Sequence, residues 1–247
     1  STLCETSTGV THDIQALGKI IKDTSAILVV DAISGLGAIP LYTDDWFCDV
    51  VFSGSQKGLM LPPGLGFISV SKKAEDLMAN SNLPKYYFDL KKAKDALKKT
   101  DTPFTPAITL VIGLREALNL IKEEGLENVF RKHKRLASAV RSAVKALGLE
   151  LFAQESCASD AITAIKVPLG IDGEKLVRIM RDDYGVTIAG GQEELKGKIF
   201  RIAHMGHIEE FDIIVGIACL ERVLYQLGYK FDLGVGVRAV QQVFLKE

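Results

Sequence analysis

Two charged residues follow short apolar runs and could share one catalytic site. Asp31 ends the run AILVVD, and Lys57 lies in the glycine-rich segment SGSQKG, just beyond the run DVVFS. Apolar runs of this length are typical of buried strands in an open α/β sheet, where ligands bind at the carboxyl ends of the strands. We therefore expect Asp31 and Lys57 to lie at the same edge of a sheet.

A nucleotide site is the first alternative, because an Asp after four apolar residues also ends the metal-binding strand of P-loop proteins. The chain contains no GxxxxGK[ST] motif. Its one dinucleotide-like segment, Gly35 to Pro40, has proline where the third glycine should open a helix. A nucleotide-binding protein is thereby disfavoured but stays an alternative.

The surroundings of Lys57 favour a chemical role, although an isolated lysine is usually a solvated surface residue. Ser53, Ser55 and Gln56 supply hydrogen-bonding groups beside it on a tight turn. An amine and a carboxylate at neighbouring strand ends suit pyridoxal phosphate catalysis, in which a lysine forms a Schiff base with the cofactor and a carboxylate keeps the pyridine nitrogen protonated. The pair therefore predicts an enzyme that uses this cofactor.

The elements that must position these residues predict an α/β fold. Apolar residues at helical spacing predict a helix over residues 11–22 with Thr11 as its N-cap, and buried strands are expected over 26–31, 49–53 and 66–70. The link before the third of these strands is too short for a crossover helix. That strand should therefore run antiparallel to its neighbour.

The rest of the chain predicts a change of architecture. Residues 86–105 are rich in lysine, threonine and proline and predict a surface excursion or lid, with a solvated helix over the lysine run 91–99. Short strands then alternate with helices, which is typical of a smaller α+β layer. We expect helices over residues 108–124, 126–147, 173–184, 208–227 and 235–246, and strands over 149–153, 161–167, 186–189 and 198–203. The predicted domains are residues 1–128, a remnant of a mostly parallel-sheet domain, and residues 129–247.

Composition narrows the class of protein further. Of 247 residues, 47% are hydrophobic and 25% charged, with a formal net charge of -1. These values indicate a globular protein and give no reason to expect nucleic acid or an anionic membrane as a partner. The four cysteines form no CxxC pair or Cys/His cluster, so no metal site is expected and a reducing compartment is favoured. No apolar run approaches the ~20 residues that span a bilayer, and we expect a soluble, cytoplasmic protein.

The whole sequence resembles one enzyme family. The segments AILVVDAISGLGAIPL, CDVVFSGSQKGLMLPPGLGFISVS, TPAITLVIGLREAL and GKIFRIAHMGH are similar, in this order, to the class V aminotransferases of fold type I. They are closest to the alanine:glyoxylate and serine:glyoxylate (serine:pyruvate) group. The resemblance implies pyridoxal 5′-phosphate as cofactor. It also implies transamination between a small amino acid, alanine or serine, and a 2-oxo acid, glyoxylate or pyruvate.

The resemblance also implies roles for single residues. Lys57 matches the Schiff-base lysine, Asp31 the partner of the pyridinium nitrogen, and Ile33 the residue that packs under the ring. Gln56 matches the neighbour that hydrogen-bonds the phenolic oxygen or phosphate region of the cofactor. Thr6, in ETSTGV, matches a serine near the cofactor, and either hydroxyl can donate the same bond.

Two further positions complete the implied site. Arg201, in IFRIAH, matches the arginine that clamps the substrate carboxylate; without the resemblance, a strand-end salt bridge is the simpler interpretation. Thr105 matches a residue that reaches the phosphate of the neighbouring subunit's cofactor, which implies a homodimer. His204 and His207 follow Arg201 closely enough to lie near the site, whereas His133 is expected on a charged helix face.

Other functions stay open beside this one. Cysteine desulfuration or lyase chemistry on the same cofactor is disfavoured, because no cysteine lies on an evident mobile loop and Gln56 rather than histidine precedes Lys57. A non-catalytic accessory subunit that keeps the fold is a further alternative.

The length of the chain bears on its activity. The first residue is Ser1 rather than Met, and the resemblance implies that the chain is the C-terminal two-thirds of an aminotransferase. Family members carry upstream the glycine-rich phosphate loop, the aromatic residue that stacks on the ring and much of the dimer interface. On this interpretation, the chain alone would bind the cofactor weakly and show little activity.

Overall fold

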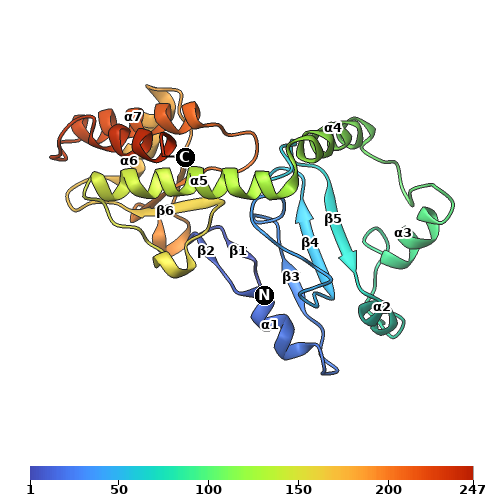
Figure 1. Ribbon diagram of the computed structural model, residues 1–247. Coiled ribbons are helices and arrows are strands. Elements are labelled where there is room, and N and C mark those ends of the chain that lie inside the picture. The colour runs from blue at the N-terminus through green and yellow to red at the C-terminus, as the bar shows by residue number, and fades with distance from the viewer. Residues whose placement is uncertain (247) are drawn as a thin grey trace.

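One long helix connects two lobes. In the computed structural model, which describes residues 1–246, α5 (Leu126–Ala146) lies along the second lobe and meets the first lobe at its N-terminal end (Figure 1). Each lobe contains a three-stranded sheet. Two hydrophobic clusters accompany them, one among the first 51 residues together with Ala161 and Ile162, and one built from α5 and the elements that follow it.

The strands predicted over residues 26–31, 49–53 and 66–70 form the three-stranded sheet of the first lobe. β3 (Val29–Asp31) pairs in parallel with β4 (Val50–Gly54), and Asp31 lies opposite Phe52. β5 (Gly66–Val70) pairs with β4 in the antiparallel sense, which confirms the prediction from the short link. The N-terminal residues extend this arrangement, because the Leu3 amide donates to the Asp31 carbonyl at 2.7 Å. Two short strands, β1 (Cys4–Glu5) and β2 (Val10–Thr11), form an antiparallel pair beside them.

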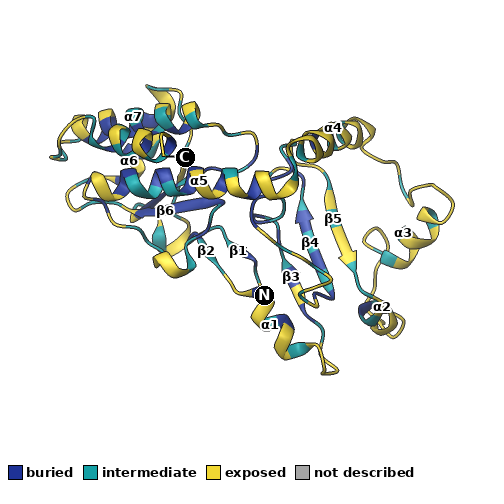
Figure 2. Ribbon diagram, viewed as in Figure 1, coloured by how far each residue is buried: buried dark blue, intermediate teal, exposed yellow. Residues whose placement is uncertain are grey.

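Four helices of the first lobe surround or extend away from this sheet: α1 (Ile14–Ile21), α2 (Lys72–Met78), α3 (Leu90–Leu97) and α4 (Ile108–Glu124). The predicted N-cap of α1, Thr11, is wrong by two residues, because the Asp13 side chain accepts from the Ala16 amide and caps the helix. The lysine-rich helix is confirmed as α3, which has no buried residue. Figure 2 shows α3 and most of α4 as exposed.

The second lobe holds an antiparallel sheet in the order β6-β8-β7. Its elements are β6 (Ile162–Lys166), β7 (Ala189–Gly190), β8 (Ile199–Ala203), α6 (Gly173–Asp182), α7 (Glu210–Gln226) and α8 (Val235–Phe244), with 3₁₀ turns at Glu155–Cys157 and Glu193–Leu195. The strand predicted over residues 149–153 is wrong. That segment makes only a single bridge, Leu151 to Ile165, because the chain soon turns away into the first 3₁₀ turn.

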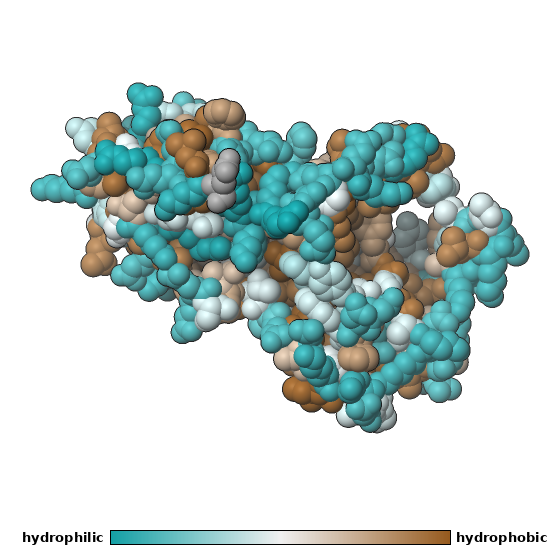
Figure 3. All heavy atoms as spheres, viewed as in Figure 1, coloured by the Kyte–Doolittle hydropathy of each residue, from teal (hydrophilic) through white to brown (hydrophobic). Residues whose placement is uncertain are grey.

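Large apolar side chains remain exposed on the first lobe. They lie along α4 and on the outer strands, and include Val29, Ile68, Ile108, Val111, Ile112, Leu118 and Leu120. Figure 3 shows apolar surface gathered beneath α4, in the hollow between this helix and the extended arm that carries α3. Exposed apolar patches of this kind are typical of surfaces that contact another protein segment. No helix within residues 1–246 has the length and apolar character needed to cross a membrane.

Candidate active site

The segment after β3 holds Asp31 in a fixed turn. Its Oδ1 atom accepts a hydrogen bond from the Ile33 amide at 2.9 Å, which orients the carboxyl group at the end of the strand. Ser34, the next residue along the turn, is buried, and its hydroxyl group hydrogen-bonds that of Thr6. Thr6 therefore lies against the turn that carries Asp31 and Ile33, whose roles toward a cofactor stay predictions.

The segment after β4 holds Lys57 on an equally constrained turn. The buried Ser55 hydroxyl donates to the Pro62 carbonyl at 2.7 Å and accepts from the Leu65 amide at 3.1 Å, closing the loop that contains the lysine. Gly58 packs directly on the loop that follows Asp31, since a Cβ atom at Gly58 would lie 2.4 Å from the Leu36 carbonyl oxygen. Only a residue without a side chain allows this approach, so the two loops lie in contact.

Arg201 comes to the same place from the second lobe. It lies on β8 and is only 5% exposed. Its Nη1 atom donates to the Thr6 carbonyl at 2.7 Å and its Nε atom to the Gly190 carbonyl at 2.9 Å. Within residues 1–246 it has no salt-bridge partner, so the strand-end salt bridge is not what holds it. A buried cation hydrogen-bonded only to carbonyl groups remains able to bind an anion.

The electrostatics of the site agree with this geometry. Burial lowers the pKa of the Arg201 guanidinium, and the nearby charge of Glu5 opposes that effect. Hydrogen bonds from Ser7 hold the pKa of Glu5 below its usual range, so Glu5 stays ionised near neutral pH. Burial raises the pKa of the Cys4 thiol, and the charge of Lys57 acts weakly in the opposite direction. The Lys57 amine thus lies within electrostatic reach of β1, the strand that precedes Thr6.

The contacts that bring the other site residues together do not involve Gln56 or Thr105. The Gln56 side chain is exposed and lies over Gly54, where a Cβ atom would meet its Oε1 atom at 2.7 Å. Thr105 is exposed in the segment before α4, and within residues 1–246 its side chain makes no hydrogen bond to the other site residues. The roles of Gln56 and Thr105 stay predictions.

Two of the histidines, His133 and His204, are fully buried. His133 is wrong as a residue of a charged face, because its side chain is fully buried on α5. The signal was present: Val129, Phe130 and Leu136 occupy the same helical face at spacings of three and four. His204 is also fully buried, with its ring bonded to the Thr163 hydroxyl at 2.8 Å and the Asp160 carbonyl at 3.0 Å. Burial lowers the pKa of His204 to about 3.

Comparison with known proteins shows the family of the chain. Residues 1–204 match the family described as Aminotransferase class-V. The chain belongs to the class-V aminotransferase family.

Proteins with several different names are similar to the chain. It is 48% identical over 242 residues to the "Soluble hydrogenase, small subunit" of Synechococcus sp. (strain PCC 6716), covering 97% of this chain and 62% of that protein. It is 41% identical to a serine–glyoxylate aminotransferase of Arabidopsis thaliana, covering 95% of this chain and 60% of the relative. Among solved structures, ureidoglycine-glyoxylate aminotransferase of Bacillus subtilis superposes with a TM-score of 0.94 at 32% identity, covering 98% of this chain and 64% of that one.

These comparisons define the fold and the cofactor of the class-V family. The fold is that of the fold type I aminotransferases, with the chain spanning about 62% of the length of the first relative above. The cofactor of the family is pyridoxal 5′-phosphate. The site fits it, because Lys57, Asp31 and Arg201 supply an amine, a carboxylate and a guanidinium that no salt bridge within residues 1–246 engages. In that same part of the chain, no group of three or more His, Cys, Asp or Glu side chains could hold a metal ion.

Proposed function

We propose that the protein is a pyridoxal-phosphate aminotransferase that moves an amino group between a small amino acid, alanine or serine, and glyoxylate or pyruvate. The observation that carries the proposal is the convergence of three segments, those of Asp31, Lys57 and Arg201, with each charged group left without an ion-pair partner in the described residues. Relatives named for glyoxylate as acceptor and for serine or ureidoglycine as donor support the choice of substrates.

Pyridoxal phosphate, when bound, supplies an aldehyde that takes up amines and a ring that withdraws electrons. Asp31 would hold a proton on the ring nitrogen, since a carboxylate favours the charged form of a neighbouring base. Its Oδ1 atom already accepts from Ile33, so the carboxyl group is orientated before any ligand arrives. Ile33 follows directly and supplies an apolar surface for the ring.

Lys57 would hold the cofactor through its Nζ atom and, once released, carry a proton to and from the substrate α-carbon. A proton carrier must stay within hydrogen-bond reach of the carbon it serves. The turn that bears Lys57 meets this need, because Ser55 closes the loop and the Met60 amide donates to the Lys57 carbonyl at 2.9 Å.

Arg201 would bind the substrate carboxylate and so orient the α-carbon over Lys57. Its planar guanidinium matches a carboxylate in a bidentate manner, and burial strengthens that interaction by excluding water. The bonds from Arg201 to Thr6 and Gly190 fix the guanidinium plane while leaving it without a carboxylate partner among residues 1–246.

We also propose that the protein acts as a homodimer, with Thr105 directed to the phosphate of the neighbouring subunit's cofactor. The exposure of Thr105 in the segment before α4 supports this role. The exposed apolar side chains along α4, among them Ile108, Val111 and Ile112, support an interface on the same helix.

A transamination assay tests the proposal. Purified protein with added pyridoxal phosphate is given serine or alanine and glyoxylate, and glycine formation is followed; Lys57→Ala is the matched control. Because the chain spans about 62% of the length of its first relative above, we expect only slow glycine formation by the wild-type protein, and none above background from the variant. Equal product from both proteins would refute the role of Lys57.

The name of one relative favours a second candidate, an accessory subunit that keeps the fold. In that case the protein would form no glycine with any donor, yet would co-purify with a larger enzyme complex.

A further inference from the structure

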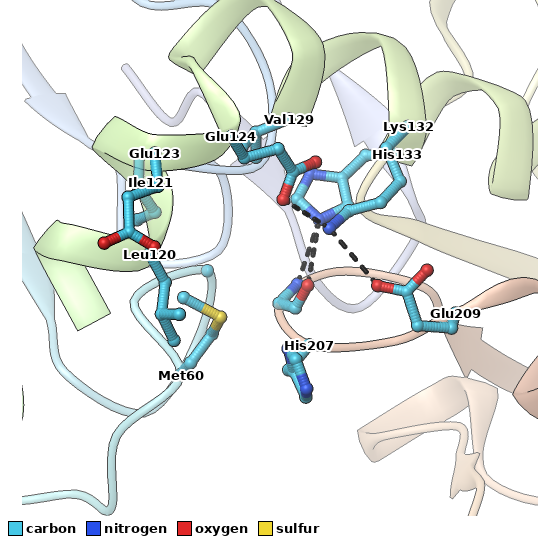
Figure 4. A pocket seen from close by; sticks show the side chains of 12 residues that line it. Met60, Leu120, Ile121, Glu123, Glu124, Val129, Lys132, His133, His207 and Glu209 are labelled. Atoms are coloured by element: carbon cyan, nitrogen blue, oxygen red, sulfur yellow. Dashed lines mark hydrogen bonds and ion pairs between the residues drawn. The ribbon is translucent and has the colours of Figure 1, made fainter. Parts of the chain in front are cut away.

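Three turns that belong to the candidate active site meet around a single side chain, that of His133. This residue lies near the start of α5 and is fully buried. It is not part of any segment that carries Asp31, Lys57 or Arg201. Its position between the two lobes, where α5 meets the first one, makes its polar contacts worth following one by one (Figures 1 and 4).

The ring of His133 bonds to both lobes. Its Nδ1 atom lies 3.1 Å from the Ala38 carbonyl oxygen, and its Nε2 atom accepts from the Gly206 amide at 3.1 Å. A carbonyl oxygen can only accept, so Nδ1 carries the proton and Nε2 is the acceptor. Burial lowers the pKa of His133, which keeps the ring in this neutral form. The Gly206 carbonyl lies at 3.3 Å from Nε2, slightly farther than the amide.

The two residues bonded to the His133 ring each lie shortly after a site residue in the sequence. Ala38 lies seven positions after Asp31, and Gly206 five positions after Arg201. Gly206 also rests on the turn of Lys57: it adopts a φ of +83°, and a Cβ atom there would lie 3.4 Å from Met60 Cγ and 3.7 Å from the Lys57 carbonyl oxygen. The His133 ring therefore joins the turn after β8 to the loop of Ala38, and Gly206 in that same turn rests on the turn that carries Lys57.

Few other groups near His133 can replace its hydrogen bonds to Ala38 and Gly206. Ala38 and Gly206 are buried, so water does not readily replace the ring as their hydrogen-bond partner. On the solvent side, Lys132 pairs with Glu124 at 2.8 Å and with Glu209 at 3.5 Å, across a pocket of about 240 Å³ lined in part by His133, Met60 and His207 (Figure 4). Partly exposed ion pairs of this kind contribute little to stability.

We propose that His133 is a positioning residue that sets the spacing between Arg201 and Lys57 by joining the turns of Ala38 and Gly206. The proposal rests on the proposed function, because it concerns how the substrate carboxylate, bound at Arg201, is placed over Lys57. If this spacing changes, the donor carboxylate can no longer reach Arg201 while the amino group is held at Lys57, so the donor binds more weakly and the loss appears in KM.

Two variants separate the bonds of the ring. His133→Asn places an amide near the position of Nδ1 and can keep the bond to Ala38, whereas His133→Gln reaches the position of Nε2 and can keep the bond to Gly206. His133→Leu removes both. We expect His133→Leu to raise the KM for the amino acid donor about 10- to 100-fold with a much smaller change in kcat. His133→Gln should restore most of the KM, and His133→Asn should restore less, because only the Gly206 bond leads to Arg201.

The control is Leu136→Ala, a core substitution on the same helix at a residue that is 1% exposed. It should lower the free energy of unfolding by ~2–5 kcal/mol and leave the KM unchanged. An unchanged KM in His133→Leu, or an equal rise in Leu136→Ala, would overturn the proposal, because the effect would then be one of general stability.

A second measurement does not depend on activity. Long-range ¹H–¹⁵N correlation spectra of histidine-labelled protein without added cofactor report which ring nitrogen carries the proton. We expect His133 as the Nδ1–H tautomer at neutral pH. A ring protonated on Nε2 would show that the bonds to Ala38 and Gly206 do not form as described, and would overturn the proposal. Absence of transamination in the wild-type protein, by contrast, would refute the proposed function and leave this structural result standing.

Discussion

Replacement of Arg201 should distinguish a substrate-binding guanidinium from a structural one. The side chain is held by two carbonyl oxygens at 2.7 and 2.9 Å, and no carboxylate within residues 1–246 pairs with it. A bidentate pair with a substrate carboxylate adds two charge-assisted hydrogen bonds at about 1.5–3 kcal/mol each. Their loss in Arg201→Leu should therefore cost ~3–6 kcal/mol, or about 10²–10⁴-fold in kcat/KM.

The assay compares two amines that differ only in the carboxylate. Serine and ethanolamine are tested with wild-type, Arg201→Leu and Arg201→Lys proteins. We expect Arg201→Leu to lower kcat/KM for serine by that factor and to change the value for ethanolamine by less than about fivefold. Arg201→Lys keeps the charge but loses the bidentate geometry, so its value for serine should fall between the other two.

Stability must be measured alongside, because the same substitution leaves the Thr6 and Gly190 carbonyls without their partner. Urea unfolding supplies the free energy of unfolding for each variant. Equal losses of kcat/KM for serine and ethanolamine in a folded Arg201→Leu protein would refute a carboxylate-binding role. Arg201 would then be a structural residue that joins β8 to the N-terminal segment.

Three further predictions concern other described residues. Asp31→Asn should retain some cofactor, seen by its absorbance, but lose most turnover, because a neutral amide does not hold the ring nitrogen protonated; near-normal kcat would contradict its role. Glu221→Ala should lower the free energy of unfolding in urea by ~3–5 kcal/mol, because the buried carboxylate accepts three amide bonds at the start of α8, from Gly234, Gly236 and Val237. A loss below ~1 kcal/mol would show that this cap is dispensable. His204 has a pKa of about 3 in the fold against an ordinary value of 6.5, so its neutral form stabilises the fold fully above pH 6.5. As the pH falls from 6.5 to 3, the free energy of unfolding should drop by about 1.4 kcal/mol per pH unit because of His204. Urea unfolding of His204→Gln should show a smaller drop over this range. Equal pH dependence in the wild-type protein and the variant would contradict the prediction.

The strand ends of the first lobe could be predicted from the sequence because apolar runs and glycine-rich turns carry strong local signals. The parallel pairing that sets Asp31 opposite Phe52 follows from two such runs, and the antiparallel β5 follows from a link too short for a helix. The strand predicted over residues 149–153 is wrong although the composition of that segment suits a strand. A strand also needs a neighbouring strand that pairs with it along its length, and here only Leu151 bridges to Ile165.

The contacts between lobes could not be predicted in the same way. The bonds from Arg201 to Thr6 and from His133 to Ala38 join residues that lie 195 and 95 positions apart. No local spacing records such pairs, and a histidine between lysines is easily taken for a surface residue. The apolar positions at three and four residues from His133 are the local signal of its burial, and they outweigh its charged neighbours. The division of the chain near residue 128 stays a prediction.

The central claim, that Lys57 holds pyridoxal phosphate, has one direct test. The protein is incubated with the cofactor, reduced with borohydride, digested and analysed by mass spectrometry. We expect the yellow colour to bleach and the pyridoxyl mass to appear on the peptide that contains Lys57, and to be absent in Lys57→Ala. A protein that stays colourless and unmodified, or a label spread over exposed lysines such as those of α3, would contradict the claim.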